Sequence, residues 1–317
     1  QLPEKFIDEA ILAISSWDNY APTPLIKLNK LNDELKFKNI YYKDEDKRFE
    51  LKSFKALGGA FAVYKIASEK KNITVSTATA GNHGRSVAWG AQRLGLKCKI
   101  FISEFVSESR AEAMRNLDAE VIRVKGNYDN SLKECIKQSN ANNWEIVQDV
   151  SWEGYKEVPK LIMAGYTIMV KEILDEINSN SITHVFLQAG VGGMAAAMIA
   201  GFAKLSKNIP KFITVEPENA DCVFQSIKNN KPTTVDIKKE TIMGGMSCGD
   251  VSSIAWEILK NSTNYCLTVP DEAISTTVAL LAKKHLSEEK IIAGECAVPG
   301  IIALIGSFNN KEYLDKL

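Results

Sequence analysis

Lys55 is a side chain whose neighbours suggest chemistry. It stands in the segment SFKALGGA, residues 53–60, which is apolar, rich in glycine and typical of a helix start. Apolar surroundings favour the uncharged amine, which can attack a carbonyl carbon or remove a proton from an adjacent C–H bond. A solvated lysine at a helix start has the same local pattern, so this segment alone leaves both interpretations open.

The segment QAGVGGM, residues 188–194, has the composition of an anion-binding loop. It follows an apolar run and opens an alanine-rich helical pattern, so its backbone N–H groups and the helix N-terminus favour a phosphate. It lacks the Lys-Ser/Thr of a nucleoside-triphosphate loop and the spacing of a dinucleotide loop. A plain strand-to-helix turn is the alternative. The predicted phosphate-binding residues are Gly190, Val191, Gly192, Gly193 and Met194.

The segment TATAGNHG, residues 77–84, is a polar glycine turn between a strand pattern and a helix pattern. Its hydroxyl groups, amide and backbone N–H groups are suited to a carboxylate or a phenolate oxygen. His83 by itself is more simply interpreted as a packed residue at a helix start than as a base. The candidate ligand-binding residues here are Thr79, Ala80, Gly81, Asn82 and His83.

The elements that must position these segments alternate along the chain. The predicted strands are 73–77, 99–102, 120–124, 145–149, 183–187 and 211–215. The predicted helices are 85–94, 109–117, 128–140, 155–177 and 195–205. This alternation indicates an α/β protein with parallel sheets, in which ligands bind at the carboxyl ends of the strands.

Composition narrows the possible partners. The 317 residues carry 39 basic and 39 acidic side chains, and a net charge of zero disfavours nucleic acid and anionic membrane surfaces. The length suggests two domains, at roughly 100–200 residues per domain. The N-terminal segment has no secretory pattern, so we expect the cytoplasm. The cysteines and histidines show no metal-ligand spacing, so no metal site is predicted.

The order of these motifs resembles one enzyme family. The segments PTPL (22–25), SFK (53–55), AGNH (80–83) and GVGGM (190–194) are similar to those of fold type II pyridoxal-phosphate (PLP) enzymes, which include threonine and serine dehydratases. The likeness is greater to diaminopropionate ammonia-lyases. It is carried by KDEDKRF (43–49), FKALGGAF (54–61), GNHGRSVAW (81–89), WEGY (152–155), VEPENADC (215–222) and TIMGGMSCG (241–249).

The resemblance implies a two-domain α/β fold like that of the tryptophan synthase β subunit, with parallel sheets flanked by helices. It implies a large cofactor-binding domain made of residues 1–69 and 182–317, a small mobile domain at 70–181, and a homodimer. It also implies a strand after residue 317, carrying the group that meets the pyridine nitrogen of PLP; the sequence in hand ends before it.

The resemblance also implies roles for single residues. Lys55 would bind PLP covalently and remove the Cα proton of an L-amino acid, and Asn82 would bind the cofactor's phenolate oxygen. The loop at 79–83 would receive the substrate carboxylate, and Tyr155 would contact the substrate. Asp149, at the end of a predicted strand, would face the substrate and hold a β-ammonium group, with a helix cap as its alternative. The products would be a 2-oxo acid and ammonia.

Two departures from the lyases bear on the substrate. Ala80 stands where the lyases have an aspartate credited with proton removal from the D-isomer, so we expect activity on L-substrates alone. Losing this carboxylate also strengthens the alternative of an L-serine, L-threonine or 3-hydroxyaspartate dehydratase. Cys296 replaces a serine in the expected site wall. Cys222 and Cys248 lie in lyase-like segments, and we expect both to be reduced thiols.

Two further alternatives remain at this point. A β-replacement enzyme related to cysteine synthases would share the cofactor, but WEGY (152–155) and GGAF (58–61) argue against it. A catalytically inactive amino-acid-binding protein would keep the same fold without the reaction.

Overall fold

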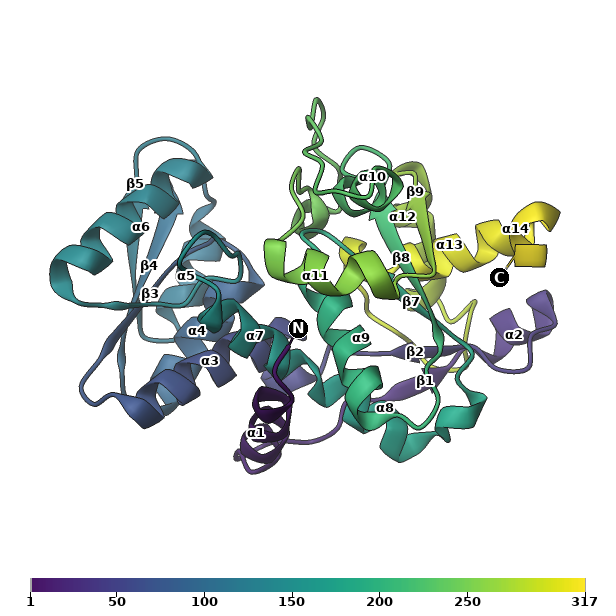
Figure 1. Cartoon of the computed structure of the whole chain (residues 1–317), viewed down its shortest axis with the longest axis horizontal. Helices are drawn as coiled ribbons and strands as arrows, with labels where there is room; N and C mark the ends of the chain where they lie inside the picture. Colours follow the sequence, from purple (N-terminus) through teal and green to yellow (C-terminus); the bar gives the residue numbers. More distant parts are fainter. Residues whose placement is uncertain (1, 317) are drawn as a thin grey trace. The chain divides into compact units, whose positions relative to one another are not determined.

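The computed structural model describes residues 2–316, which form two compact units (Figure 1). The first unit comprises Pro22–Asp46 and the chain from Met169 onward, and the second comprises Leu2–Ala21 and Lys47–Ile168. No helix in the described part of the chain is long and apolar enough to cross a membrane.

The second unit is built on a parallel sheet with strand order β5-β4-β3-β6. Its strands are β3 (Thr74–Ala78), β4 (Lys97–Ser103), β5 (Ala119–Val124) and β6 (Glu145–Ile146). The helices are α1 (Glu4–Ser15), α3 (Lys55–Glu69), α4 (Asn82–Arg93), α5 (Glu108–Arg115), α6 (Tyr128–Asn142) and α7 (Glu157–Tyr166). Because β3 lies inside this sheet, both the segment after β3 and the segment after β6 emerge at its carboxyl edge.

The first unit holds a second parallel sheet, with strand order β7-β8-β9, and a small antiparallel pair, β1-β2. The strands are β1 (Leu25–Lys27), β2 (Tyr41–Lys43), β7 (His184–Gln188), β8 (Lys211–Pro217) and β9 (Tyr265–Val269). The helices are α2 (Asn29–Leu35), α8 (Ile168–Glu176), α9 (Gly193–Leu205), α10 (Cys222–Lys228), α11 (Ser253–Ser262), α12 (Glu272–Ala282), α13 (Pro299–Phe308) and α14 (Lys311–Lys316).

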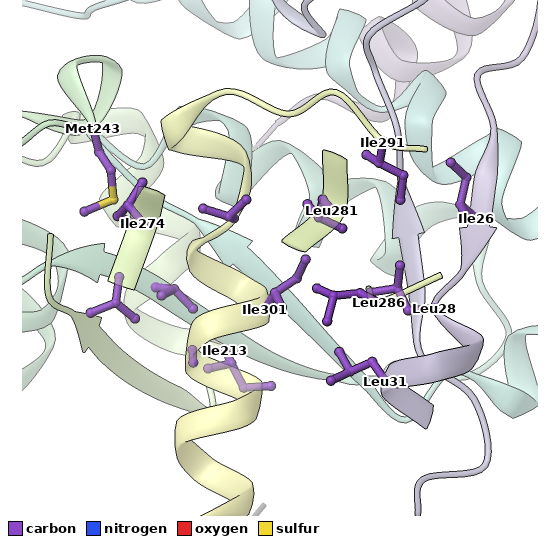
Figure 2. Packing of buried hydrophobic residues seen from close by; sticks show 14 of the residues in the cluster. Ile26, Leu28, Leu31, Ile213, Met243, Ile274, Leu281, Leu286, Ile291 and Ile301 are labelled. Atoms are coloured by element: carbon purple, nitrogen blue, oxygen red, sulfur yellow. The ribbon is translucent and has the colours of Figure 1, made fainter. Parts of the chain in front are cut away.

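A hydrophobic core joins the elements of the first unit (Figure 2). Ile213 of β8 and Ile301 of α13 are buried with Ile274 of α12 and with Leu28 and Leu31 near α2. Burying one such side chain contributes about 1.5–3 kcal/mol. The core therefore holds β8 firmly, and β7 with it, since the two strands pair directly.

The predicted domain boundary differs from the division into units. Residues 2–21 and 47–69 lie in the second unit, whereas the resemblance implied one domain of 1–69 with 182–317. Side-chain contacts supply the reason. The Ala60 N–H of α3 donates to Ser86 Oγ of α4 at 3.1 Å, and the Trp17 ring lies 5.9 Å from that of Trp89. The predicted boundary at residue 182 also differs, because the first unit resumes at Met169.

Two predicted elements are wrong in extent. The strand predicted over 145–149 ends at Ile146, and the helix predicted over 155–177 is two helices, α7 and α8. Tyr155 is outside α7 because it pairs with Trp152 in a turn. The break between the helices lies at buried Thr167, whose backbone N–H and hydroxyl both donate to the Ala164 carbonyl, at 3.1 and 2.6 Å. A threonine hydroxyl competes in this way with the regular helical hydrogen bonds.

Candidate active site

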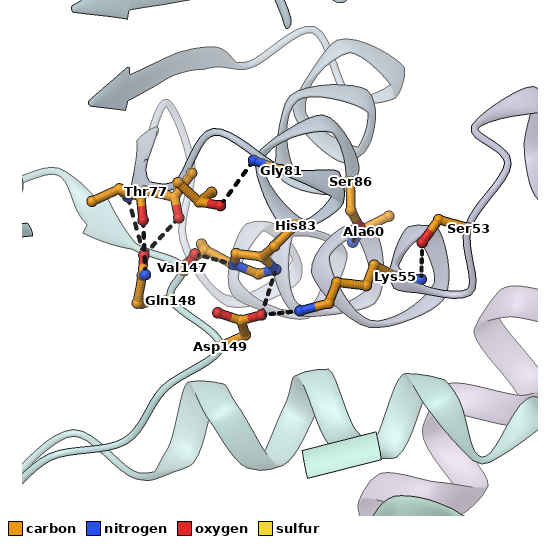
Figure 3. A network of polar contacts seen from close by, with 12 residues as sticks. Ser53, Lys55, Ala60, Thr77, Gly81, His83, Ser86, Val147, Gln148 and Asp149 are labelled. Carbon is orange, nitrogen blue, oxygen red and sulfur yellow. Dashed lines mark hydrogen bonds and ion pairs between the residues drawn. The ribbon is translucent and has the colours of Figure 1, made fainter. Parts of the chain in front are cut away.

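Lys55 is the first residue of α3, as the glycine-rich pattern predicts. Its backbone N–H donates to Ser53 Oγ at 3.2 Å, which fixes the start of the helix. Its ammonium group lies 2.5 Å from Asp149 Oδ2 (Figure 3). The structure therefore brings together two residues that are 94 positions apart in the chain.

Asp149 faces an ammonium group in this structure, that of Lys55. Burial alone would raise the pKa of Asp149, but interactions with His83 and Lys55 outweigh burial and hold this pKa well below the usual range of a carboxyl group. Asp149 is thus a carboxylate at neutral pH. Asp149 is not the cap of the helix that follows it, because α7 begins at Glu157 and Lys156 is its N-cap.

The backbone next to Asp149 is held by Gln148, which is fully buried. Its side-chain amide accepts from the Ala78 N–H at 3.0 Å and donates to the Ala78 carbonyl at 2.9 Å. It also accepts from Thr77 Oγ1 at 2.7 Å (Figure 3). These bonds link the chain beyond β6 to the end of β3, where the backbone ladder has stopped. The Gln148 side chain thus replaces the missing backbone pairing between the two strands and holds the backbone at Asp149 in place.

Tyr155 supports the same segment from its other side. Its hydroxyl accepts from the Gln148 N–H and donates to the Ile146 carbonyl, both at 2.8 Å. Its ring stacks on Trp152, with centroids 4.0 Å apart, across the turn that contains Gly154. The hydroxyl of Tyr155 is thus occupied by backbone groups, and its predicted role in binding substrate stays a prediction.

Two contributors to this site were missed at the level of sequence. Gln148 and Tyr128 are joined by a 2.9 Å hydrogen bond from the Gln148 amide to the Tyr128 hydroxyl. Gln148 could have been suspected from its position, because it directly precedes Asp149 at the end of a predicted strand. Tyr128 had none, since it is the first residue of α6 and its partner lies 20 residues away.

The loop at 79–83 also belongs to the second unit. It leaves the end of β3 and enters α4, whose N-terminus has no side-chain cap. Thr79 and Ala80 are half-buried, whereas Gly81 and Asn82 are exposed. Uncapped N–H groups at the start of a twelve-residue helix suit an anion such as a carboxylate. Of the loop residues, His83 makes direct contact with the Lys55 site, its Nδ1 lying 3.9 Å from Asp149 Oδ2.

The glycine loop predicted to bind phosphate lies in the first unit, between β7 and α9. Gly192 has φ +88°, and a Cβ there would lie 2.7 Å from Leu259 Cδ1. A Cβ on Gly190 would lie 3.1 Å from the Gly245 carbonyl oxygen. Among the residues that the structure describes, no side chain caps α9. Gly193 begins the helix with open space where its Cβ would be. This arrangement fits a phosphate group held by backbone N–H groups.

Cysteines lie beside this loop. The Cys222 thiol is 3.6 Å from the Gly190 carbonyl, and Cys222 and Cys248 are both thiols in the structure. Burial, helped by the charge of Glu216, raises the pKa of Cys222 far above its usual range, so this thiol stays protonated. Cys296 is half-buried, and its Sγ lies 3.3 Å from where a Cβ on Gly245 would stand.

Comparisons with known proteins identify the family of this chain. A family model described as pyridoxal-phosphate dependent enzyme matches residues 17–315. The chain belongs to this family. The predicted cofactor, pyridoxal 5'-phosphate, is confirmed. So is the predicted fold class, the α/β fold of type II PLP enzymes with parallel sheets flanked by helices.

The most similar relatives in these comparisons include diaminopropionate ammonia-lyases. That of Escherichia coli K12 is 34% identical over 304 residues, covering 89% of this chain and 76% of the relative. That of Salmonella typhimurium LT2 is 35% identical over 327 residues, covering 94% of this chain and 81% of the relative. A crystal structure of the Escherichia coli lyase with an aminoacrylate-PLP azomethine reaction intermediate has a TM-score of 0.89 and 32% identity, and covers 99% of this chain and 84% of that chain.

The residues of each unit fit one part of PLP. Lys55 would supply an amine for its aldehyde, and the loop at 190–194 would supply uncapped backbone N–H groups for its phosphate. The structure brings Lys55, Asp149, His83 and Tyr155 together within the second unit, and it holds the phosphate loop within the first.

Proposed function

We propose that this chain is a PLP-dependent ammonia-lyase that carries out α,β-elimination on a small L-amino acid resembling 2,3-diaminopropionate. The products are a 2-oxo acid and ammonia. The observation that carries this proposal is the Lys55–Asp149 ion pair at the start of α3, in a chain 34% identical to a diaminopropionate ammonia-lyase.

Lys55 has two tasks in this reaction. Its amine binds the cofactor, and once displaced by the substrate it removes the Cα proton of the L-isomer. PLP, when bound, supplies an electron sink for the charge left at Cα. The residues of the chain bind and orient the substrate and exchange protons with it. Asn82 binds the phenolate oxygen of the cofactor, and the N–H groups of the loop at 79–83 orient the substrate carboxylate.

Asp149 is suited to hold the leaving group of a diamino substrate. It lies 2.5 Å from the Lys55 ammonium, so its surroundings accept a cation at hydrogen-bonding distance. A β-ammonium group that occupies a similar place would be held by a charge-assisted hydrogen bond. A β-hydroxyl group carries no charge and would gain less from this carboxylate, so Asp149 favours the diamino substrate.

Ala80 favours the second candidate, a dehydratase acting on L-serine, L-threonine or 3-hydroxyaspartate. Its methyl group offers no charge to a second amino group and takes no proton from a D-isomer. We therefore propose that D-2,3-diaminopropionate is not turned over, whichever leaving group the enzyme prefers.

A substrate screen tests this function. The purified protein, loaded with PLP, is given L- and D-2,3-diaminopropionate, L-serine, L-threonine and the hydroxyaspartates, and release of ammonia and 2-oxo acid is measured. We expect the highest kcat/KM for L-2,3-diaminopropionate. A higher value for a β-hydroxy substrate would make the chain a dehydratase, and no release from any of them would refute the elimination.

The Lys55→Ala variant is the control for this screen. It keeps the phosphate loop and should lose the yellow colour of the lysine-bound cofactor together with activity. A wild-type protein that binds PLP without any turnover would instead support an inactive amino-acid-binding protein.

Two finer statements remain proposals. We propose a homodimer and a cytoplasmic location, both on the resemblance to the lyases. Light scattering tests the first and cell fractionation the second.

A further inference from the structure

The two ring nitrogens of His83 differ in their contacts among the described residues: Nε2 is hydrogen-bonded, and Nδ1 is not. Its side chain is 2% exposed, and Nε2 lies 2.8 Å from the Val147 carbonyl oxygen. A carbonyl oxygen only accepts, so Nε2 carries the hydrogen and Nδ1 of the neutral ring keeps a lone pair. Within residues 2–316, Nδ1 has no hydrogen-bond partner. It faces Asp149 Oδ2 at 3.9 Å, so two acceptor atoms face each other in a buried place (Figure 3).

A proton between Asp149 Oδ2 and His83 Nδ1 would satisfy both acceptors. The same Oδ2 atom already binds the Lys55 ammonium at 2.5 Å, so the three side chains form a row in the order Lys55, Asp149, His83. Burial chiefly lowers the pKa of His83, and the charge of Lys55 lowers it further, whereas Asp149 raises it. When Lys55 loses its proton, the lowering by its charge disappears and the effect of Asp149 remains. The proton affinity of His83 therefore rises as Lys55 becomes neutral.

We propose that His83 takes up the proton that Lys55 releases when its amine reacts, with Asp149 passing the proton between them. An N–H bond of the Lys55 ammonium breaks and an N–H bond at His83 Nδ1 forms. Lys55 becomes a neutral amine, Asp149 is a carboxylate before and after, and His83 becomes an imidazolium. The net charge of the row does not change. His83 does not contact the reacting amine itself. It acts on Lys55 through Asp149, by holding the released proton.

The other titratable groups near this row do not compete for the proton. Tyr128, Tyr155 and Tyr166 all interact with Asp149, and burial raises the pKa of each, to about 12 for Tyr128. All three stay neutral phenols near pH 7. Besides the Asp149 carboxylate, whose own pKa is held low, His83 Nδ1 is thus the base of this row that has no hydrogen-bond partner among the described residues.

The His83→Gln variant separates the proton-holding role from a structural one. A glutamine amide can donate to the Val147 carbonyl as Nε2 does, but it is not a base. The full chain is freed of PLP, and acylation of Lys55 by a small anhydride is followed by mass spectrometry across pH. In the variant we expect Lys55 to be acylated about tenfold more slowly near pH 7.5, because no base then receives the proton of its ammonium group, and the difference should vanish at a pH where the lysine is already neutral. Lys65, on the same helix, is the internal control and should not change.

A second measurement checks the tautomer itself. In the wild-type chain, ¹⁵N NMR of the histidine rings should show an unprotonated Nδ1 at His83 near pH 7. An unchanged Lys55 profile in His83→Gln, or a hydrogen on Nδ1 in the wild type, would overturn the proposal. The inference rests on the proposed function only in that Lys55 is the reacting amine. Both measurements use the protein without cofactor or substrate. They therefore still test the role of His83 if the substrate screen fails.

Discussion

The two units present their predicted ligand-binding groups in different ways. Around Lys55, the second unit uses side chains: Asp149 pairs with Lys55 at 2.5 Å, and Gln148 and Tyr155 hold the neighbouring backbone through hydrogen bonds of 2.8–3.0 Å. At the start of α9, the first unit uses the backbone, with small residues that let other segments approach closely. A side-chain network can lose one member and keep the rest, whereas a backbone turn either has room for a Cβ or does not. The two regions should therefore respond differently to substitution.

The largest effect is expected at the backbone site. Gly192→Ala adds a Cβ at φ +88°, 2.7 Å from Leu259 Cδ1, and should destabilise the protein by roughly 3 kcal/mol and abolish PLP binding. Gly193→Ala is the matched control, because no atom lies within 4 Å of its added Cβ. Urea unfolding and absorbance titration with PLP measure both. Equal effects at the two positions would show that this loop is not limited by its backbone.

The next effect is expected in the side-chain network. Gln148→Leu leaves the Ala78 N–H and carbonyl and the Thr77 hydroxyl without their buried partner, which should cost about 2–3 kcal/mol and lower kcat by tenfold or more. Gln138→Leu, on the half-buried side of α6, is the control and should change stability by less than about 1 kcal/mol. Normal turnover in Gln148→Leu would mean that the position of Asp149 does not depend on this brace.

A smaller effect is expected for Tyr155→Phe. The ring and its stacking on Trp152 remain, but the hydroxyl that bridges the Ile146 carbonyl and the Gln148 N–H is lost. We expect about 1–2 kcal/mol lower stability in chemical denaturation, with kcat reduced and KM for the substrate unchanged. A raised KM with unchanged kcat would instead support the role in substrate binding predicted from the sequence.

The smallest effect is expected from pH acting on the first unit. Burial raises the pKa of Glu216 to about 8, although its carboxyl accepts from the N–H groups of Val223 and Phe224 at 2.8 and 2.7 Å. A folded-state pKa above the unfolded value means that the folded protein binds more protons between these values. Stability is therefore greatest at the acidic end of this range and falls as pH rises toward 8.

Glu216→Gln tests this pH dependence. The amide does not ionise, so unfolding midpoints measured from pH 5 to 8 should form a flatter profile than in the wild type. An equal slope in both proteins would assign the pH dependence to other groups.

The two regions also differ in how well they could be predicted from the sequence. The position of the glycine loop between a strand and a helix was predicted, because its properties are local: a strand, a turn that needs small residues and a helix start follow one another within one short segment. Lys55 at the first position of α3 was predicted for the same reason. The contact between Lys55 and Asp149 was not, since a spacing of 94 residues carries no periodic signal.

The errors fall where tertiary contacts override local pattern. The strand predicted to end at Asp149 ends at Ile146, because Gln148 replaces backbone pairing with side-chain bonds to Ala78. The predicted helix over 155–177 is interrupted, because the buried Thr167 hydroxyl bonds the Ala164 carbonyl. Neither partner can be identified from propensity, since each depends on what the side chain meets after folding.

The sequence by itself determined the alternating α/β pattern, the glycine loop and the lysine at a helix start, because each rests on residues adjacent in the chain. Through its resemblance to the lyases it also indicated the cofactor and the class of reaction. Only the tertiary structure decided that Asp149 pairs with Lys55, that Tyr155 and Gln148 hold the segment of Asp149, and that Nδ1 of His83 faces this carboxylate. These contacts join elements far apart in the chain, and their distances arise from how the helices pack on the sheet.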